Sequence, residues 1–279
     1  MGGAWLQFIA SGLTAGAIYA LVALGFSIIY NASGAINFAQ GEFVMIGGMS
    51  AVTLLAAGLP LALAVTLAIV VAVVVALLVE KLAIEPARDA DTVTLIIITI
   101  GVSLFLRGLA QLIWDKGVHR LPAFSSEQPL QFLGATLLPQ SLWVMGGAAL
   151  AVVALSAFYG RTLLGKAMLA TSYNRVAAQL VGIPTRGVLF ASFGLAAALG
   201  ALGGVLIAPI AFTAYDTGVM LGLKGFAAAM LGGLGSFGGA VLGGLLLGLL
   251  EGLGAGFISS AYKDRSEERR VGKECRSRW

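Results

Sequence analysis

The sequence predicts an all-α protein, a polytopic bundle of transmembrane helices with glycine-rich broken or re-entrant segments. Hydrophobic residues make up 59% of the 279 residues and charged residues only 11%, whereas soluble domains contain about 25% charged residues. A soluble core of this size could not hide so much apolar surface, so we expect a bilayer as the solvent. Backbone groups in hydrocarbon must be paired within their own segment, which favours helices over open strands.

The sequence contains seven or eight apolar stretches that are long enough for a spanning helix, which needs roughly 20 residues. The count stays open because the glycine-rich region after Lys224 can either span or re-enter. The candidates are Trp5–Tyr30, Glu42–Gly58, Leu61–Val79, Thr92–Trp114, Ser141–Phe158, Val188–Ile207, Val219–Ser236 and Gly239–Ile258.

The 39 glycines predict close helix packing, because small residues let membrane helices approach backbone to backbone. Small residues recur every four positions in three segments. We assign Gly200, Gly204, Gly244 and Gly248 to helix packing. The sequence leaves open whether these helix contacts are static or allow the helices to slide. The three ladders are Gly12/Gly16/Ala20, Ala196/Gly200/Gly204/Ala208 and Gly244/Gly248/Gly252/Gly256.

Basic residues predict the orientation in the membrane. Tyr159–Arg186 carries four basic side chains and no acid, so we expect it in the cytoplasm. Alternation then places Lys81–Asp91 in the cytoplasm and both the N-terminus and Asp115–Gln140 outside. The first basic residue is Lys81, so the first apolar segment lacks the charged start of a signal peptide and is predicted to be a retained span.

Residue usage argues against an enzyme. A single cysteine, Cys275, and a single histidine, His119, exclude a disulfide framework and a cysteine-based zinc site and leave little acid–base chemistry. We predict no catalytic residue, no metal site and no nucleic-acid partner.

Four isolated charges need an explanation. Arg107 and Glu251 lie inside predicted spans, where a charge indicates function or pairing near a helix end, and Asp216 and Lys224 are expected at the external surface.

The first informative segment lies between the first two apolar stretches and is rich in amide and carboxyl groups. Polar groups at membrane depth are costly unless they are paired or line a wet cavity, and a broken helix can bind a zwitterion. The residues form either a substrate pathway or the caps of two helices, and both interpretations remain open. The candidates are Asn31, Ser33, Asn37, Gln40 and Glu42.

The second informative segment is 165–186, with a short amphipathic helix. Ser172 or Asn174 can cap the helix and Gly182 can close it. Its apolar stripe needs a partner, either the protein's own helix ends or another subunit. The stripe comprises Ala177, Leu180 and Val181. A third segment, 224–244, has too many glycines for a straight helix and predicts a kinked or re-entrant element.

Four sequence blocks closely resemble the LivH-type permeases of branched-chain amino acid ABC transporters, and the likeness covers about residues 5–263. The blocks are Gly16–Phe26, Asn37–Glu42, Asn174–Ala178 with Gly182 and Ile183, and Leu231–Ser236. The resemblance implies a multi-pass permease of the bacterial inner membrane, in a binding-protein-dependent importer of branched-chain amino acids. Urea or short amides are the alternative solutes, and an ion-coupled secondary transporter is the rival mechanism.

The resemblance also implies partners: a second related permease subunit, two cytoplasmic ATPase subunits that bind the ATP, and a soluble substrate-binding protein. Membrane lipid is the remaining partner, and no cofactor is expected in this chain. The ATPase-coupling residues implied by the family pattern are Asn174, Arg175, Ala177, Ala178 and Gly182. The match is partial because Val176 stands where the general pattern prefers glutamate.

The end of the sequence differs from the rest. Residues 263–279 hold seven Lys/Arg and four Asp/Glu, and this segment accounts for most of the net charge of +4. Members of the resembled family would continue into one more apolar helix. We therefore expect a permease domain over 1–262 and a charged, non-native tail over 263–279 in place of a last helix.

Overall fold

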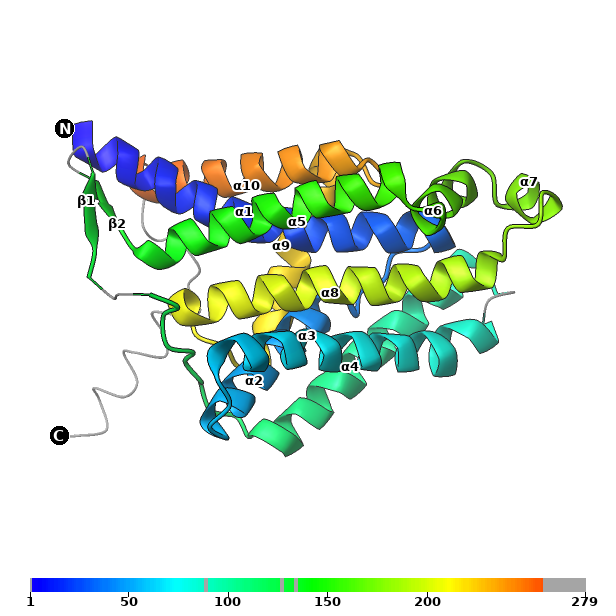
Figure 1. Ribbon diagram of the computed structural model, residues 1–279, viewed down its shortest axis with the longest axis horizontal. Helices are drawn as coiled ribbons and strands as arrows, with labels where there is room; N and C mark the ends of the chain where they lie inside the picture. Colours follow the sequence, from blue (N-terminus) through cyan, green and yellow to red (C-terminus); the bar gives the residue numbers. More distant parts are fainter. Residues whose placement is uncertain (1, 88–89, 126–127, 133–134, 258–279) are drawn as a thin grey trace.

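The structure, a computed structural model, describes residues 2–87, 90–125, 128–132 and 135–257. Its long helices lie roughly along one axis and form a single bundle (Figure 1). The charged tail, 263–279, lies outside the described residues. The helices are α1 (Gly2–Ser33), α2 (Gln40–Ala56), α3 (Leu61–Val79), α4 (Thr92–Trp114), α5 (Pro139–Arg161), α6 (Leu163–Tyr173), α7 (Arg175–Leu180), α8 (Thr185–Ala211), α9 (Thr217–Gly232) and α10 (Phe237–Phe257).

Six of the described helices are long and apolar enough to cross a membrane, which confirms the predicted polytopic bundle. They are Trp5–Ser33, Leu61–Ala87, Thr92–Trp114, Pro139–Arg161, Thr185–Ala211 and Phe237–Gly256. Directly after α3 the helix continues through a π-helical turn, Glu80–Ile84, and then a 3-10 turn, Glu85–Ala87. The other two candidate spans form α2 and α9, of 17 and 16 residues. Whether these shorter helices cross or re-enter the membrane stays a prediction.

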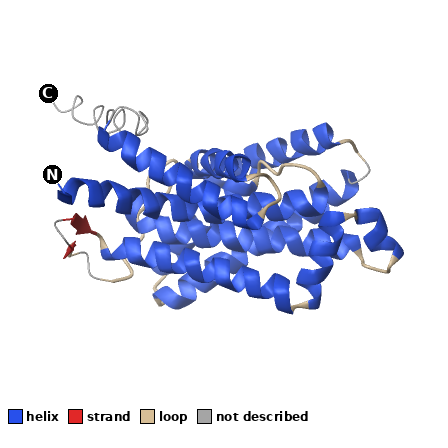
Figure 2. Ribbon diagram, turned by 90° about the horizontal axis from the view of Figure 1, so that it is seen from above, coloured by secondary structure: helices blue, strands red, loops and turns tan. Residues whose placement is uncertain are grey.

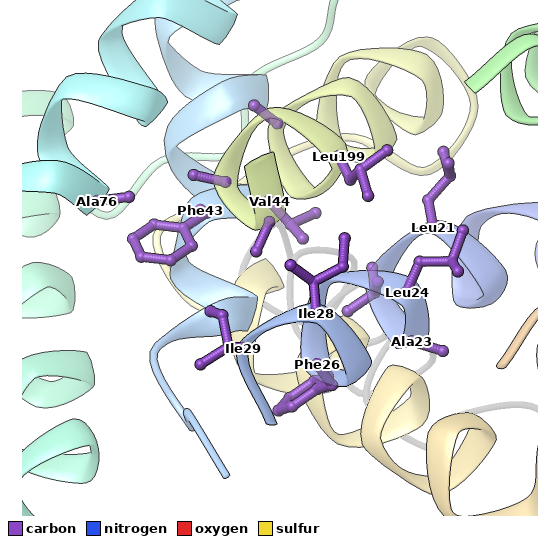
Figure 3. Packing of buried hydrophobic residues seen from close by; sticks show 14 of the residues in the cluster. Leu21, Ala23, Leu24, Phe26, Ile28, Ile29, Phe43, Val44, Ala76 and Leu199 are labelled. Atoms are coloured by element: carbon purple, nitrogen blue, oxygen red, sulfur yellow. The ribbon is translucent and has the colours of Figure 1, made fainter. Parts of the chain in front are cut away.

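Helix α1 lies at the centre of the bundle and packs against α8, α9 and α10. Its residues from Ile18 to Ile29 form the middle of the hydrophobic core, with side chains of α2 and α8 (Figure 3). The bulkiest fully buried side chains are Phe26, Phe43 and Phe193. The core therefore joins two consecutive helices, α1 and α2, with α8, which is far from them in sequence.

Glycines bring α1 and α10 into backbone contact. A Cβ atom on Gly12 would lie 2.8 Å from the carbonyl oxygen of Gly248, and one on Gly16 would lie 3.0 Å from that of Gly244. Real Cβ atoms require more room, so the two helix backbones touch here without intervening side chains. Close backbone approach of this kind is how small residues hold membrane helices together.

The second glycine contact joins α2 and α8. A Cβ on Gly204 would overlap the backbone of Val44, and one on Gly200 would lie 3.4 Å from Cβ of Phe43 and 3.2 Å from Nε2 of Gln40. The four glycines assigned to packing thus lie at two separate helix contacts, two in each.

The connecting segments gather at opposite ends of the bundle. The N-terminus and the β1–β2 hairpin lie at one end, whereas α6 and α7 project from the other (Figures 1 and 2). Strands β1 (Leu130–Phe132) and β2 (Ala135–Leu137) pair antiparallel. This hairpin is a small departure from the all-α prediction, and it is allowed because the loop lies beyond the helix ends, where the hydrocarbon constraint does not apply.

Helix α4, which carries part of the site, has a clear start. Asp91 is its N-cap, and its carboxylate accepts hydrogen bonds from the hydroxyl and the backbone amide of Thr94. These hydrogen bonds stabilise the charged form, so the pKa of Asp91 lies below its ordinary value.

Candidate functional site

Two of the five candidate polar residues, Asn31 and Ser33, lie in the last turn of α1 and hold its end. Asn31 Nδ2 donates a hydrogen bond of 2.8 Å to the carbonyl oxygen of Gly235, in the turn between α9 and α10. The hydroxyl of Ser33 donates to the carbonyl oxygen of Ile29 and accepts from the amide of Ala35. Both side chains therefore satisfy backbone groups where the helix stops.

Two further residues are fully buried where α2 begins. Asn37 Oδ1 accepts a hydrogen bond of 3.0 Å from the backbone amide of Ala39. Gln40 Nε2 donates to the carbonyl oxygen of Ala196 on α8, at 2.9 Å. The amide of Gln40 fits there because the neighbouring Gly25 and Gly200 have no side chains.

Glu42 is the centre of a buried polar cluster. Its side chain is 1% exposed, and Oε1 accepts hydrogen bonds from Ser103 Oγ at 2.8 Å and from Arg107 Nη2 at 3.1 Å. Glu42 is the third residue of α2, where the positive end of the helix dipole stabilises a carboxylate. Ser103 is the twelfth of the 23 residues of α4, so the cluster lies near the middle of a membrane-spanning helix.

The α4 side of this contact is a polar stripe. The hydroxyl of Thr99 accepts a hydrogen bond of 3.1 Å from the amide of Phe38. Thr99, Ser103 and Arg107 are spaced four residues apart, so they share one face of the helix. That spacing is the sequence signal that could have grouped Thr99 and Ser103, which were not among the expected site residues, with Arg107.

A second polar cluster joins α1, α9 and α10. Lys224 Nζ lies 2.9 Å from Glu251 Oε1, and the hydroxyl of Tyr19 donates to Glu251 Oε2 at 2.7 Å. Lys224 was expected at the external surface, but it lies in the middle of α9 and is 25% exposed. Both Glu251 and Arg107 are thus paired with an opposite charge.

Two small cavities adjoin the polar segment. One is lined partly by Ser33, Asn37 and Thr99 and has a volume of about 10 Å³, which is enough for about one water molecule. The other, beside Asn31 and Tyr159, has a volume of about 0 Å³. Neither holds a solute of amino-acid size, so the contact of the five polar residues with a solute stays a prediction.

The short helix α7 is formed as its local sequence predicts. Of the two candidate caps, Asn174 is the one used: its Oδ1 accepts a hydrogen bond of 3.0 Å from the amide of Ala177. The helix is closed at Gly182, which has a φ of +86°, a conformation that glycine adopts without strain.

The apolar side chains of α7 remain mostly uncovered. Ala178 is 3% exposed, whereas Val176, Leu180 and Val181 are 66%, 84% and 77% exposed. All three residues of the predicted stripe, Ala177, Leu180 and Val181, are exposed, so the alternative in which the stripe packs on its own chain does not apply. The buried Ala178 lies outside the stripe. Arg175 is half-buried.

No three His, Cys, Asp or Glu side chains of the described residues gather into a group that could hold a metal ion.

Known proteins are similar to this sequence along most of its length. Residues 8–268 match the family described as "Branched-chain amino acid transport system / permease component". The permease protein LivH of Escherichia coli (strain K12) is 34% identical, over 93% of this chain and 89% of that protein. BraD of Pseudomonas aeruginosa is 33% identical over the same shares, and LivH of Methanocaldococcus jannaschii is 29% identical over 87% and 78%. The chain therefore belongs to the family of branched-chain amino acid transport permeases.

Proposed function

We propose that this permease subunit moves branched-chain amino acids into the cytoplasm across a bacterial inner membrane. The observation that carries the proposal is the family match over residues 8–268. It is supported by the LivH and BraD relatives, whose names give high-affinity branched-chain amino acid transport. The six long apolar helices fit a multi-pass subunit of this kind.

The pathway forms between two permeases, this chain and a second related subunit. Two observations support this arrangement. The cavities beside the polar segment are too small for a solute, and helices α3, α4, α5, α9 and α10 expose apolar side chains. A second permease covers part of this surface, and membrane lipid covers the rest. A soluble binding protein delivers the solute from outside.

Two cytoplasmic ATPase subunits bind the ATP and drive transport, while this chain carries no cofactor and hydrolyses nothing. Their docking site is the α6–α7 segment, which projects from the end of the bundle predicted to be cytoplasmic (Figure 1). The support is the uncovered apolar surface of Val176, Leu180 and Val181. Apolar side chains that extend beyond the membrane are typical of a protein contact.

The substrate assignment is tested by uptake in cells with and without the gene. Deletion should lower the uptake of labelled leucine, isoleucine and valine at least tenfold at limiting concentration, and a plasmid copy should restore it. Labelled urea and acetamide should enter at the same rate in both strains. Loss of urea or acetamide uptake with normal leucine uptake would replace the proposed substrate by a short amide.

The docking assignment is tested with two leucines that are both 84% exposed, Leu180 on α7 and Leu112 on α4. Leu180→Ser should lower the amount of ATPase that copurifies with the chain at least fivefold, because the helix loses its central apolar contact. Leu112→Ser, at the other end of the bundle, should leave copurification unchanged. Equal amounts of ATPase with both variants would place the docking surface elsewhere.

A further inference from the structure

The cluster of Tyr19, Lys224 and Glu251 lies inside the membrane-spanning bundle, toward one end. Glu251 stands 14 residues after Phe237, the first residue of α10, a distance of about 21 Å along the helix axis in a hydrocarbon core of about 30 Å. Helix α10 runs toward the end of the bundle at which the N-terminus lies (Figures 1 and 2), and the charge pattern predicts that end to be external. The cluster is therefore in the outer half of the membrane.

Both charged side chains of this cluster reach the surface of the chain. Lys224 is 25% exposed and Glu251 is 26% exposed, in contrast to Glu42 at 1%. A charge that faces lipid is costly, and charged residues in spans face a bundle interior or a water-filled cavity. The face formed by α9 and α10 around this pair is therefore directed at water or at another subunit.

The chemistry of the pair complements the head group of an α-amino acid. At neutral pH that head group carries one carboxylate and one ammonium group, and the protein offers one ammonium and one carboxylate 2.9 Å apart. The ring centroid of Tyr19 lies 5.6 Å from Lys224 Nζ, which stabilises the cation. The tyrosine hydroxyl also orients the carboxylate of Glu251 by its hydrogen bond.

Apolar side chains stand beside the charges. On α9, Met220 is 40% exposed and Leu223 is 53% exposed. Met220 precedes Lys224 by one helical turn, so the two side chains are neighbours on the helix surface. The aliphatic side chain of an amino acid whose head group contacts the pair can therefore pack against Met220 and Leu223 of α9.

We propose that Lys224 and Glu251 form a binding subsite for a zwitterionic amino acid on the external side of the pathway. The ammonium group of Lys224 contacts the carboxylate of the solute, and the carboxylate of Glu251 contacts its ammonium group. The subsite rests on the proposed function, because it lies on the route of the imported solute. It would receive the amino acid that the external binding protein releases.

The test measures the uptake of labelled leucine by the complete transporter in proteoliposomes, with Lys224→Met, Glu251→Gln and the double variant. All three should lower uptake at limiting leucine at least tenfold, because each loses a contact with the head group. Lys81→Met and Glu85→Gln change two charges four residues apart in the helical continuation of α3, and both variants should retain the uptake of the unmodified complex.

The double variant separates a binding site from a structural ion pair, since it leaves neither charge without its partner. If the pair only holds the helices, the double variant should regain uptake relative to the single ones, and that result would overturn the subsite. Failure of the double variant to assemble with its partner subunits would overturn it as well. An unmodified complex that imports no branched-chain amino acid would instead contradict the proposed function itself.

Discussion

Helices α4 and α10 are attached to the centre of the bundle in two different ways. Helix α10 touches α1 mainly backbone to backbone at Gly244 and Gly248, beside a side-chain hydrogen bond between the two helices, whereas α4 is held by hydrogen bonds and by the Glu42–Arg107 ion pair. In lipid, apolar contact alone gives little driving force, so helices associate through close packing or through polar bonds. The first attachment should therefore fail when volume is added, and the second when a charge is removed.

The largest effect is expected from added volume at the α1–α10 contact. Gly248→Leu should prevent folding, because its Cβ would overlap the backbone of Gly16 and backbone atoms cannot move aside. The measurement is the fraction of the protein that elutes as a monodisperse complex after extraction in mild detergent.

Gly254→Leu is the matched control. It adds the same side chain to the same helix, at a glycine with no protein atom within 4 Å of the added Cβ among the described residues. A Gly248→Leu protein that elutes like this control would show that α1 and α10 are not in backbone contact.

The next effect is the loss of the buried charge at the α4 contact. Glu42→Gln should destabilise the protein by about 3–5 kcal/mol, because Arg107 then remains inside a span without its counter-charge. Glu251→Gln should cost less, since Glu251 is 26% exposed whereas Glu42 is 1% exposed, so the Lys224–Glu251 pair is less fully desolvated. Thermal unfolding of the purified complexes measures the loss of stability in both variants. An equal decrease in Tm would show that the two ion pairs contribute equally.

A smaller effect is expected from a single hydrogen bond to the same carboxylate. Ser103→Ala should cost about 1.5–3 kcal/mol, the range for hydrogen bonds to charged groups. Thr66→Ala is the control, because the hydroxyl of Thr66 bonds only to Ala62 of its own helix in the described contacts and is exposed. If both variants unfold at the same temperature, Ser103 does not contribute to the attachment of α4.

Local features of the fold could be predicted from the sequence. Apolar stretches predict the long helices because the length of a span follows from the thickness of the bilayer. The cap at Asn174 and the closure at Gly182 also follow from neighbouring residues. The lengths of α2 and α9 were less predictable, since apolar composition does not show where a short helix stops.

The pairing of charges was not predictable from local sequence. Glu42 and Arg107 are 65 positions apart, and Lys224 and Glu251 are 27 apart, so their contacts depend on how the helices pack. Lys224 was expected at the external surface because its position relative to α10 was unknown. For the same reason, the sequence left open whether the apolar stripe of α7 packs on its own chain or on another subunit, and only the structure shows that Leu180 is exposed.

We propose that ATP, bound by partner subunits, drives import through this permease. The direct measurement is leucine uptake by the purified complex in proteoliposomes, with binding protein on one side and ATP on the other. We predict uptake that requires both ATP and the binding protein and that persists when ionophores collapse all ion gradients. Uptake that needs a proton or sodium gradient and continues without ATP would contradict the account.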